Sequence, residues 1–220
     1  RILVAEGLKR LRAGRSFAGL DALARVSGRN PRELSTSDIA FGVGPRINAA
    51  GRLETMDVGV DCLTCDDPER AETLAKSLHD INDRRKEIEG EMVDEAVRQL
   101  LTDVRKERYT AVLHAPQWHQ GVIGIVAGRV KEKIWRPTFV LADGKNGEIK
   151  GSGRSIPGLH LRDALDLVDK RCPGLLLAFG GHAMAAGVTV RAGGLEQFSQ
   201  TFEDVCREHL SARDLQQEIE

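Results

Sequence analysis

The segment GGHAMAAG at residues 180–187 holds the residue types that a phosphate ligand requires. Glycine and alanine fill six of its eight positions, so the backbone can come close to a ligand and can adopt positive φ. His182 adds one side-chain donor, and exposed backbone N–H groups bind anions. Gly180, Gly181 and His182 are therefore candidate phosphate-binding residues. The alternative is a tight glycine turn between two buried segments, with His182 in solvent.

A second cluster, GSGRS at residues 151–155, brings a hydroxyl and a guanidinium to another glycine-rich backbone. Arg154 can hold a phosphate with two parallel hydrogen bonds, and the Ser152 hydroxyl can add another. The alternative is a loop with a solvated arginine. If this cluster and residues 180–187 converge, they form a pocket for a terminal phosphate.

A third segment, WHQGVIG at residues 118–124, stands where a buried strand is expected to end and a helix to begin. A helix N-terminus there offers free N–H groups, among them that of Gly121, and the positive end of the helix dipole. His119 can add a donor. The alternative is a strand-to-helix loop in which His119 simply packs.

A fourth segment, GPRINAAGR at residues 44–52, combines two arginines, an amide and two flexible glycines. Arg46 and Arg52 can contact phosphates of a phosphodiester backbone, and Asn48 can contact a sugar or a neighbouring ligand. The alternative is a helix N-terminus with solvated arginines.

The sequence contains no pattern of a hydrolytic or metal centre, such as Asp-x-Asp, Asp-His-His or His-Glu-x-x-His. Three aspartates at residues 163, 166 and 169 recur at three-residue steps, which is typical of a solvated helix face. We therefore expect no catalytic and no metal-binding residue in this chain. From its residues alone, it is a phosphate-binding module.

Composition restricts the class of protein. The 32 basic and 33 acidic side chains balance, but both glycine-rich clusters lie in a positive block, because residues 108–190 carry eleven basic and six acidic side chains. No apolar run is long enough to span a bilayer. The four cysteines form no disulfide pattern, which favours the cytoplasm. Because the chain opens on Arg1, we expect a piece of a longer protein.

Hydrophobic periodicity divides the chain into four parts. Residues 1–66 carry short helical patterns, and residues 67–107 predict one long helix, capped by Asp67, that connects two bodies rather than forming a coiled coil. Residues 108–212 alternate between strand and helix patterns, which predicts an α/β domain with a mixed sheet. The order β-α-β-β-α-β-α follows from strands near residues 110–114, 137–142, 148–152 and 187–191 and helices near 121–135, 161–168 and 195–209. Residues 213–220 would begin a linker.

The four glycine-rich segments together resemble, in their order, the motifs of the RecJ family of single-strand-specific 5′→3′ DNA exonucleases, within the DHH phosphoesterase superfamily. The resemblance runs from about Arg1 to Leu210 and includes the helix segment NDRRKEIE at residues 82–89. It implies that residues 1–66 are the end of the DHH catalytic domain and residues 108–212 the DHH-associated, nucleic-acid-binding domain.

The resemblance also implies a division of labour. The whole enzyme binds two Mn²⁺ or Mg²⁺ ions through residues that this chain lacks, so the chain alone should cleave nothing. Ser152, Arg154 and His182 would hold the 5′-phosphate of single-stranded DNA, whereas Arg46 and Asn48 would border the metal centre and touch the DNA backbone. Residues 118–124 would line the groove for the strand. The implied cellular role is recombination and repair, with single-strand-binding protein and a RecQ-type helicase as partners and no membrane.

Two other functions stay open at this point. One is a stand-alone nucleic-acid-binding module. The other is a DHH phosphoesterase that acts on very short oligonucleotides or cyclic dinucleotides. The start at Arg1 argues against the stand-alone module, and the segments at residues 44–52 and 118–124 fit the RecJ family better than the phosphoesterase.

Overall fold

A computed structural model describes residues 1–102 and 108–217. Contacts between residues divide the chain into two units, Arg1–Glu87 and Ile88–Glu220, which we call the first and second unit. The helix α5 (Pro68–Thr102) runs through both of them. No helix in the described part of the chain is long and apolar enough to cross a membrane.

The first unit is helical, as the sequence predicts. Its core forms where apolar residues of α2, α3, α4 and α5 meet, with Leu23, Cys62 and Leu78 fully buried. Helices α2 and α4 approach each other closely at Gly19. A Cβ at this position would collide with the backbone carbonyl of Cys62, so glycine is required there. The elements before α5 are α1 (Ile2–Arg12), α2 (Ala18–Val26), the π-helix η1 (Asp38–Val43), α3 (Gly44–Leu53) and α4 (Asp57–Thr64).

Side chains cap two helix starts in the first unit, one of them the start at Asp67 that the sequence predicts. Asp67 Oδ1 accepts a hydrogen bond from the N–H of Glu69 at 3.0 Å, at the beginning of α5. Ser35 and Asp38 bond each other reciprocally: Asp38 Oδ2 accepts from the Ser35 N–H and hydroxyl, and Ser35 Oγ accepts from the Asp38 N–H. Helix α5 has 35 residues and is roughly 50 Å long; the last predicted residues, 103–107, lie outside the described part.

The second unit contains a five-stranded sheet in the order β1-β2-β3-β5-β4. Strand β1 pairs with β2 in parallel, and all other neighbours are antiparallel, so the sheet is mixed. This confirms the predicted α/β class. The elements are β1 (Ala111–His114), α6 (Ile123–Ile134), β2 (Thr138–Asp143), the 3-10 helix η2 (Lys145–Gly147), β3 (Ile149–Arg154), α7 (Leu161–Arg171), β4 (Leu176–Gly181), β5 (Ala185–Val190) and α8 (Leu195–His209).

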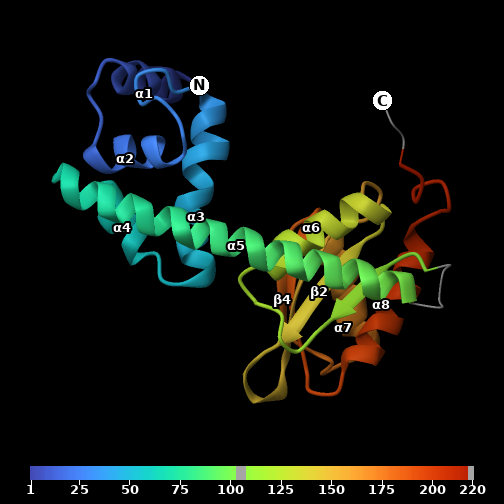
Figure 1. The fold of residues 1–220 in the computed structure, drawn as a ribbon. Helices are drawn as coiled ribbons and strands as arrows, with labels where there is room; N and C mark the ends of the chain where they lie inside the picture. The colour runs from blue at the N-terminus through green and yellow to red at the C-terminus, as the bar shows by residue number, and fades with distance from the viewer. Residues whose placement is uncertain (103–107, 218–220) are drawn as a thin grey trace. The chain divides into compact units, whose positions relative to one another are not determined.

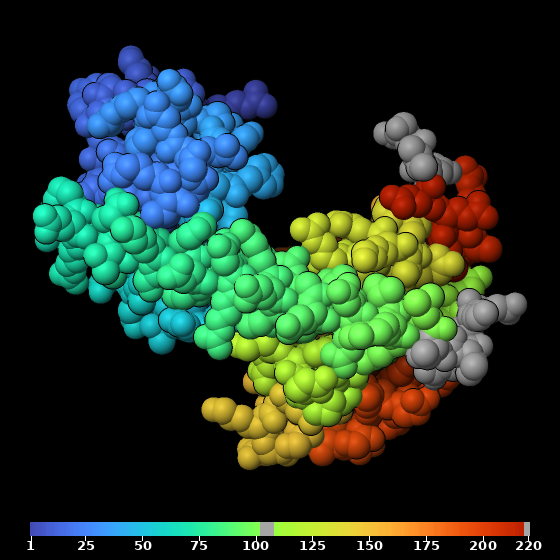
Figure 2. All heavy atoms as spheres, in the orientation of Figure 1, coloured from blue at the N-terminus to red at the C-terminus, as the bar shows by residue number. Residues whose placement is uncertain are grey.

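Helices cover the two faces of this sheet unequally (Figure 1). Helix α6 packs on β2 and β3 on one face, whereas α7 and α8 cover the other face and form the main core with it. Phe139 of β2 contacts Phe198 and Phe202 of α8 edge to face, with ring centroids 5.3 and 5.1 Å apart. Figure 2 shows the second half of α5 alongside α6, where Glu89 pairs with Arg129 at 3.2 Å.

Strand β4 is the one described strand that the sequence analysis does not predict. A β-bulge between Leu176 and Ala178 adds one residue, so Leu176 and Phe179 both lie opposite core residues of β5, Val190 and Val188. Their spacing of three breaks the two-residue alternation by which a half-buried strand is recognised. The predicted third strand also ends too early, because β3 continues through Arg154.

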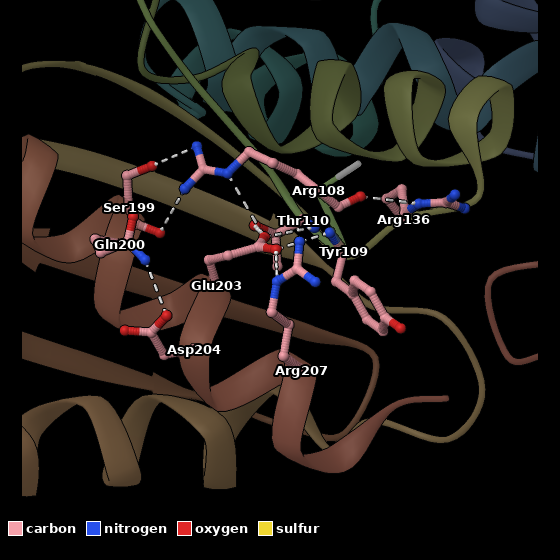
Figure 3. A network of polar contacts seen from close by, with 9 residues as sticks. All are labelled: Arg108, Tyr109, Thr110, Arg136, Ser199, Gln200, Glu203, Asp204 and Arg207. Atoms are coloured by element: carbon pink, nitrogen blue, oxygen red, sulfur yellow. Dashed lines mark hydrogen bonds and ion pairs between the residues drawn. The ribbon is translucent and has the colours of Figure 1, made fainter. Parts of the chain in front are cut away.

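A buried carboxylate fixes the start of β1 (Figure 3). Glu203 of α8 is 3% exposed and accepts hydrogen bonds from the N–H groups of Tyr109 and Thr110 at 2.9 and 3.0 Å. It also accepts from the Thr110 hydroxyl at 2.5 Å and pairs with Arg207 Nε at 2.7 Å. Arg108 Nε lies 3.6 Å from the same carboxylate. One side chain thus joins α8 to the first strand of the sheet.

Candidate nucleic-acid interface

Residues 151–154 of β3 alternate between the two faces of the sheet, as side chains of a strand do. Gly151 and Gly153 face the core: a Cβ on Gly153 would lie 2.5 Å from the Phe139 ring, and one on Gly151 would lie 2.9 Å from Leu141. These two glycines are therefore explained by packing. Ser152 and Arg154 point to the other face, where both are half-buried.

Small residues surround Ser152 and Arg154 on that face. The register sets Ser152 opposite Gly187, and Gly187 opposite Gly180. Arg154 lies opposite Ala185. We call this surface the open strand face; its residues are Ser152, Arg154, Ala178, Gly180, Ala185 and Gly187.

The fold gives no reason for glycine at Gly180 or Gly187. Both are exposed, and neither has a positive φ. Among the described residues, a Cβ built on Gly180 would meet nothing within 4 Å, and one on Gly187 would meet only the carbonyl of Gly151 at 3.9 Å. Glycine in a strand interior costs stability relative to residues with a side chain. The space that these two glycines leave above the sheet is therefore unexplained by internal packing.

The arginine on this face is held in place by its own strand. Arg154 Nη1 donates to the Ser152 hydroxyl at 3.3 Å and to the Gly153 carbonyl at 2.8 Å. Its Nη2 lies 3.3 Å from where a Cβ on Gly124 would be, and that Cβ would be 2.9 Å from Ser152 Oγ. Gly124, in the first turn of α6, therefore lets the helix start approach the serine and arginine closely.

The loop before α6 is also fixed. His119 Nδ1 accepts a hydrogen bond from the Gly121 N–H at 3.1 Å, so a neutral His119 carries its proton on Nε2. Trp118 is buried and donates from Nε1 to Glu95 of α5 at 2.7 Å. The sequence analysis does not predict the role of Glu95, because nothing in the sequence distinguishes it from the other carboxylates of the long helix.

The turn between β4 and β5 carries the histidine of the GGHAMAAG segment. Gly181 has φ of +149°, and a Cβ there would collide with Ala185, so glycine is required by the backbone. The N–H of exposed His182 donates to the carbonyl of Ala185, the residue opposite Arg154, at 2.8 Å. The three segments of the second unit thus lie on neighbouring elements, which is a condition for a common site.

The fourth segment forms α3 of the first unit. Arg46 is 8% exposed and donates to the Gly42 carbonyl at 2.6 Å, to His79 Nδ1 at 3.0 Å and to the Val26 carbonyl at 3.5 Å. The pKa of Arg46 lies below its usual value because the side chain is buried, and the negative charge of Asp83 opposes this shift only in part. Asn48 and Arg52 are exposed on the same helix.

No group of three His, Cys, Asp or Glu residues within residues 1–102 and 108–217 could hold a metal ion. Burial raises the pKa of the Cys62 thiol to about 11, with a further contribution from Cys65. Burial also raises the pKa of the Cys206 thiol. Both thiols are therefore protonated at neutral pH and are poor ligands and nucleophiles.

Comparison with known proteins agrees with this architecture. The DHHA1 domain family matches residues 107–208, so the α/β part of the chain is similar to DHHA1 domains. Over nearly its whole length, the chain is homologous to part of the single-stranded-DNA-specific exonuclease RecJ. It is 48% identical to RecJ of Dickeya dadantii over 98% of this chain and 45% identical to RecJ of Escherichia coli over 100% of it. It spans 38% of the length of each of these two relatives.

Solved structures agree as well. The chain superposes on RecJ of Thermus thermophilus in complex with Mn²⁺ with a TM-score of 0.80 and 35% identity, over 94% of this chain and 29% of that one. A Mg²⁺ complex of the same protein matches equally well. The described residues of the present chain offer no cluster of three ligands that would fit such ions.

Proposed function

We propose that the open strand face binds the 5′-phosphorylated end of single-stranded DNA, as the strand-binding part of a RecJ-type 5′→3′ exonuclease. The observation that carries this proposal is the pair of exposed glycines, Gly180 and Gly187, whose missing side chains leave room next to Arg154. A phosphate on Arg154 and Ser152 would receive a bidentate and a hydroxyl hydrogen bond. His182 and the Nε2–H of His119 are further candidate donors, and Gly121 would contribute by holding His119, because its N–H donates to His119 Nδ1.

The likeness to RecJ supports the choice of single-stranded DNA as the ligand. In this proposal, Arg46, Asn48 and Arg52 of the first unit contact the DNA backbone. Metal ions and hydrolysis belong to the parts of RecJ proteins that this chain does not align with, so the 220-residue chain binds DNA without cutting it. The proposed setting is the cytoplasm, with single-strand-binding protein and a RecQ-type helicase as partners in recombination and repair.

Removing the guanidinium should remove the preference for a phosphorylated end. We expect the chain to bind a 5′-phosphorylated single strand about tenfold more tightly than the 5′-hydroxyl strand, because hydrogen bonds to charged groups contribute about 1.5–3 kcal/mol. In Arg154→Ala the two strands should bind equally. Fluorescence anisotropy with labelled oligonucleotides measures both affinities.

The matched control is Arg162→Ala, which removes the same charge from α7, on the other face of the sheet. There, among the described residues, Arg162 forms an ion pair with Asp163 at 3.9 Å. It should keep the preference. Equal binding of both strands by the unmodified chain would contradict the phosphate site. A dinucleotide that binds as tightly as the longer strand would instead favour a phosphoesterase of short oligonucleotides.

A further inference from the structure

Arg46 connects four elements of the first unit through its guanidinium. Its hydrogen bonds reach the end of α2 at Val26, the π-helix at Gly42 and α5 at His79, while its backbone lies in α3. A π-helix leaves the regular hydrogen-bond ladder and frequently occurs at functional sites. Here the carbonyl of Gly42 in that π-helix is taken by Arg46 at 2.6 Å.

The bond to His79 determines the tautomer of this histidine. Arg46 Nε can only donate, so His79 Nδ1 must be the acceptor at 3.0 Å and the proton must be on Nε2. His79 Nε2 lies 3.5 Å from Asp83 Oδ2, one turn further along α5. Asp83 is in turn held by Lys86, at 2.9 Å, and this bond lowers the pKa of the Asp83 carboxyl.

A neutral acceptor orients an arginine without cancelling its charge. If a carboxylate occupied the place of the imidazole, it would form an ion pair with the guanidinium and compete with a phosphate for it. In this arrangement the negative charge of Asp83 stands behind His79, and Arg29, itself paired with Asp38 at 3.0 Å, is near enough to contribute to the lowered pKa of Arg46. The three hydrogen bonds use three of the five N–H bonds of the guanidinium, leaving one on each terminal nitrogen.

We propose that His79, held by Asp83, is a positioning residue that orients Arg46 for contact with a phosphate of the bound strand. This inference rests on the proposed function, in which Arg46 contacts the DNA backbone. His79 itself touches no ligand. Its role is to accept from Nε, so that the remaining N–H bonds of the terminal nitrogens are directed at the phosphate.

Two substitutions at His79 test the proposal in the 220-residue chain. His79→Leu removes the acceptor and should weaken binding of the 5′-phosphorylated single strand about tenfold. His79→Gln offers a carbonyl oxygen to Arg46 Nε and should restore affinity to within about threefold of the unmodified chain. Anisotropy measures affinity, and thermal unfolding verifies that both variants are folded.

A matched control separates positioning from helix docking. Arg25 and Glu72 form another contact between α2 and α5, at 3.2 Å, on exposed side chains. Glu72→Gln weakens this contact and should leave DNA affinity unchanged. Nitrogen-15 chemical shifts of His79 provide a readout that does not depend on DNA: we expect the Nε2–H tautomer, and conversion to a different tautomer mixture in Arg46→Gln.

Each outcome decides between the two proposals. A chain that binds no strand overturns the proposed function and this inference with it. Strand binding that His79→Leu leaves unchanged, or a His79 that carries its proton on Nδ1, overturns the positioning role alone. Equal losses in His79→Leu and His79→Gln, with normal unfolding temperatures, would also reject it, because the acceptor would then be irrelevant.

Discussion

Replacing Gly187 by valine should abolish strand binding while leaving the fold as stable as before or more so. Gly187 lies in β5 between Ser152 and Gly180, and its Cβ would meet no atom closer than 3.9 Å. A β-branched residue also suits a strand better than glycine. The new side chain would project from the open strand face where we place the DNA. We expect affinity to fall on the order of a hundredfold, as when a central contact of an interface is lost.

The control is Thr189→Val, two residues further along β5 and on the same face. It introduces the same side chain where a Cβ is already present, so affinity should change by less than about twofold. Anisotropy gives the affinities, and thermal unfolding should give a transition for Gly187→Val at or above that of the unmodified chain. Undiminished binding by Gly187→Val would mean that no strand passes over the open strand face.

The regular parts of this fold follow from patterns of the sequence. Helix α8 begins at Leu195 and ends at His209, as the sequence predicts, because its apolar residues keep helical spacing throughout. Strand β4 cannot be predicted from such a pattern, because its bulge places Leu176 and Phe179 on the core side at a spacing of three residues. The alternation of apolar and polar residues indicates which face of a strand each residue occupies only where the backbone is regular.

The glycine-rich segments illustrate a second limit. Gly153 and Gly187 look alike in the sequence, but the ring of Phe139 requires glycine at the first, and no contact among the described residues requires it at the second. The contact to Phe139 comes from a neighbouring strand, so no local pattern predicts it. The sequence therefore predicts the segments that lie around the open strand face. It does not predict which of their glycines are required by packing.

Buried arginines are equally hard to recognise. The sequence predicts Arg46 as a contact to phosphate, with a solvated arginine as the alternative, whereas Arg46 is 8% exposed and bonded to three groups of the first unit. Its role at DNA stays a prediction. His79 was not predicted at all; the four-residue spacing to Asp83 on a helix is the signal that could have pointed to the pair.

Removing the carboxylate of Glu203 should destabilise the second unit more than any surface substitution. Glu203→Ala leaves the N–H groups of Tyr109 and Thr110 without their acceptor. It also removes one partner of Arg207 and one partner of Arg108, whose side chain is 12% exposed. Breaking a buried pair by removing one partner costs about 3–5 kcal/mol. Denaturant unfolding measures this loss as a lower midpoint with an unchanged slope.

Tryptophan fluorescence isolates the relevant transition, because both tryptophans, Trp118 and Trp135, lie in the second unit. The neighbouring carboxylate serves as the control: Asp204 is exposed and bonds only Gln200, at 2.9 Å, among the described contacts, so Asp204→Ala should cost less than about 0.5 kcal/mol. Glu203→Gln keeps an acceptor oxygen and should fall between the two. If Glu203→Ala unfolds like the control, the start of β1 is held by the parallel pairing with β2 rather than by the carboxylate.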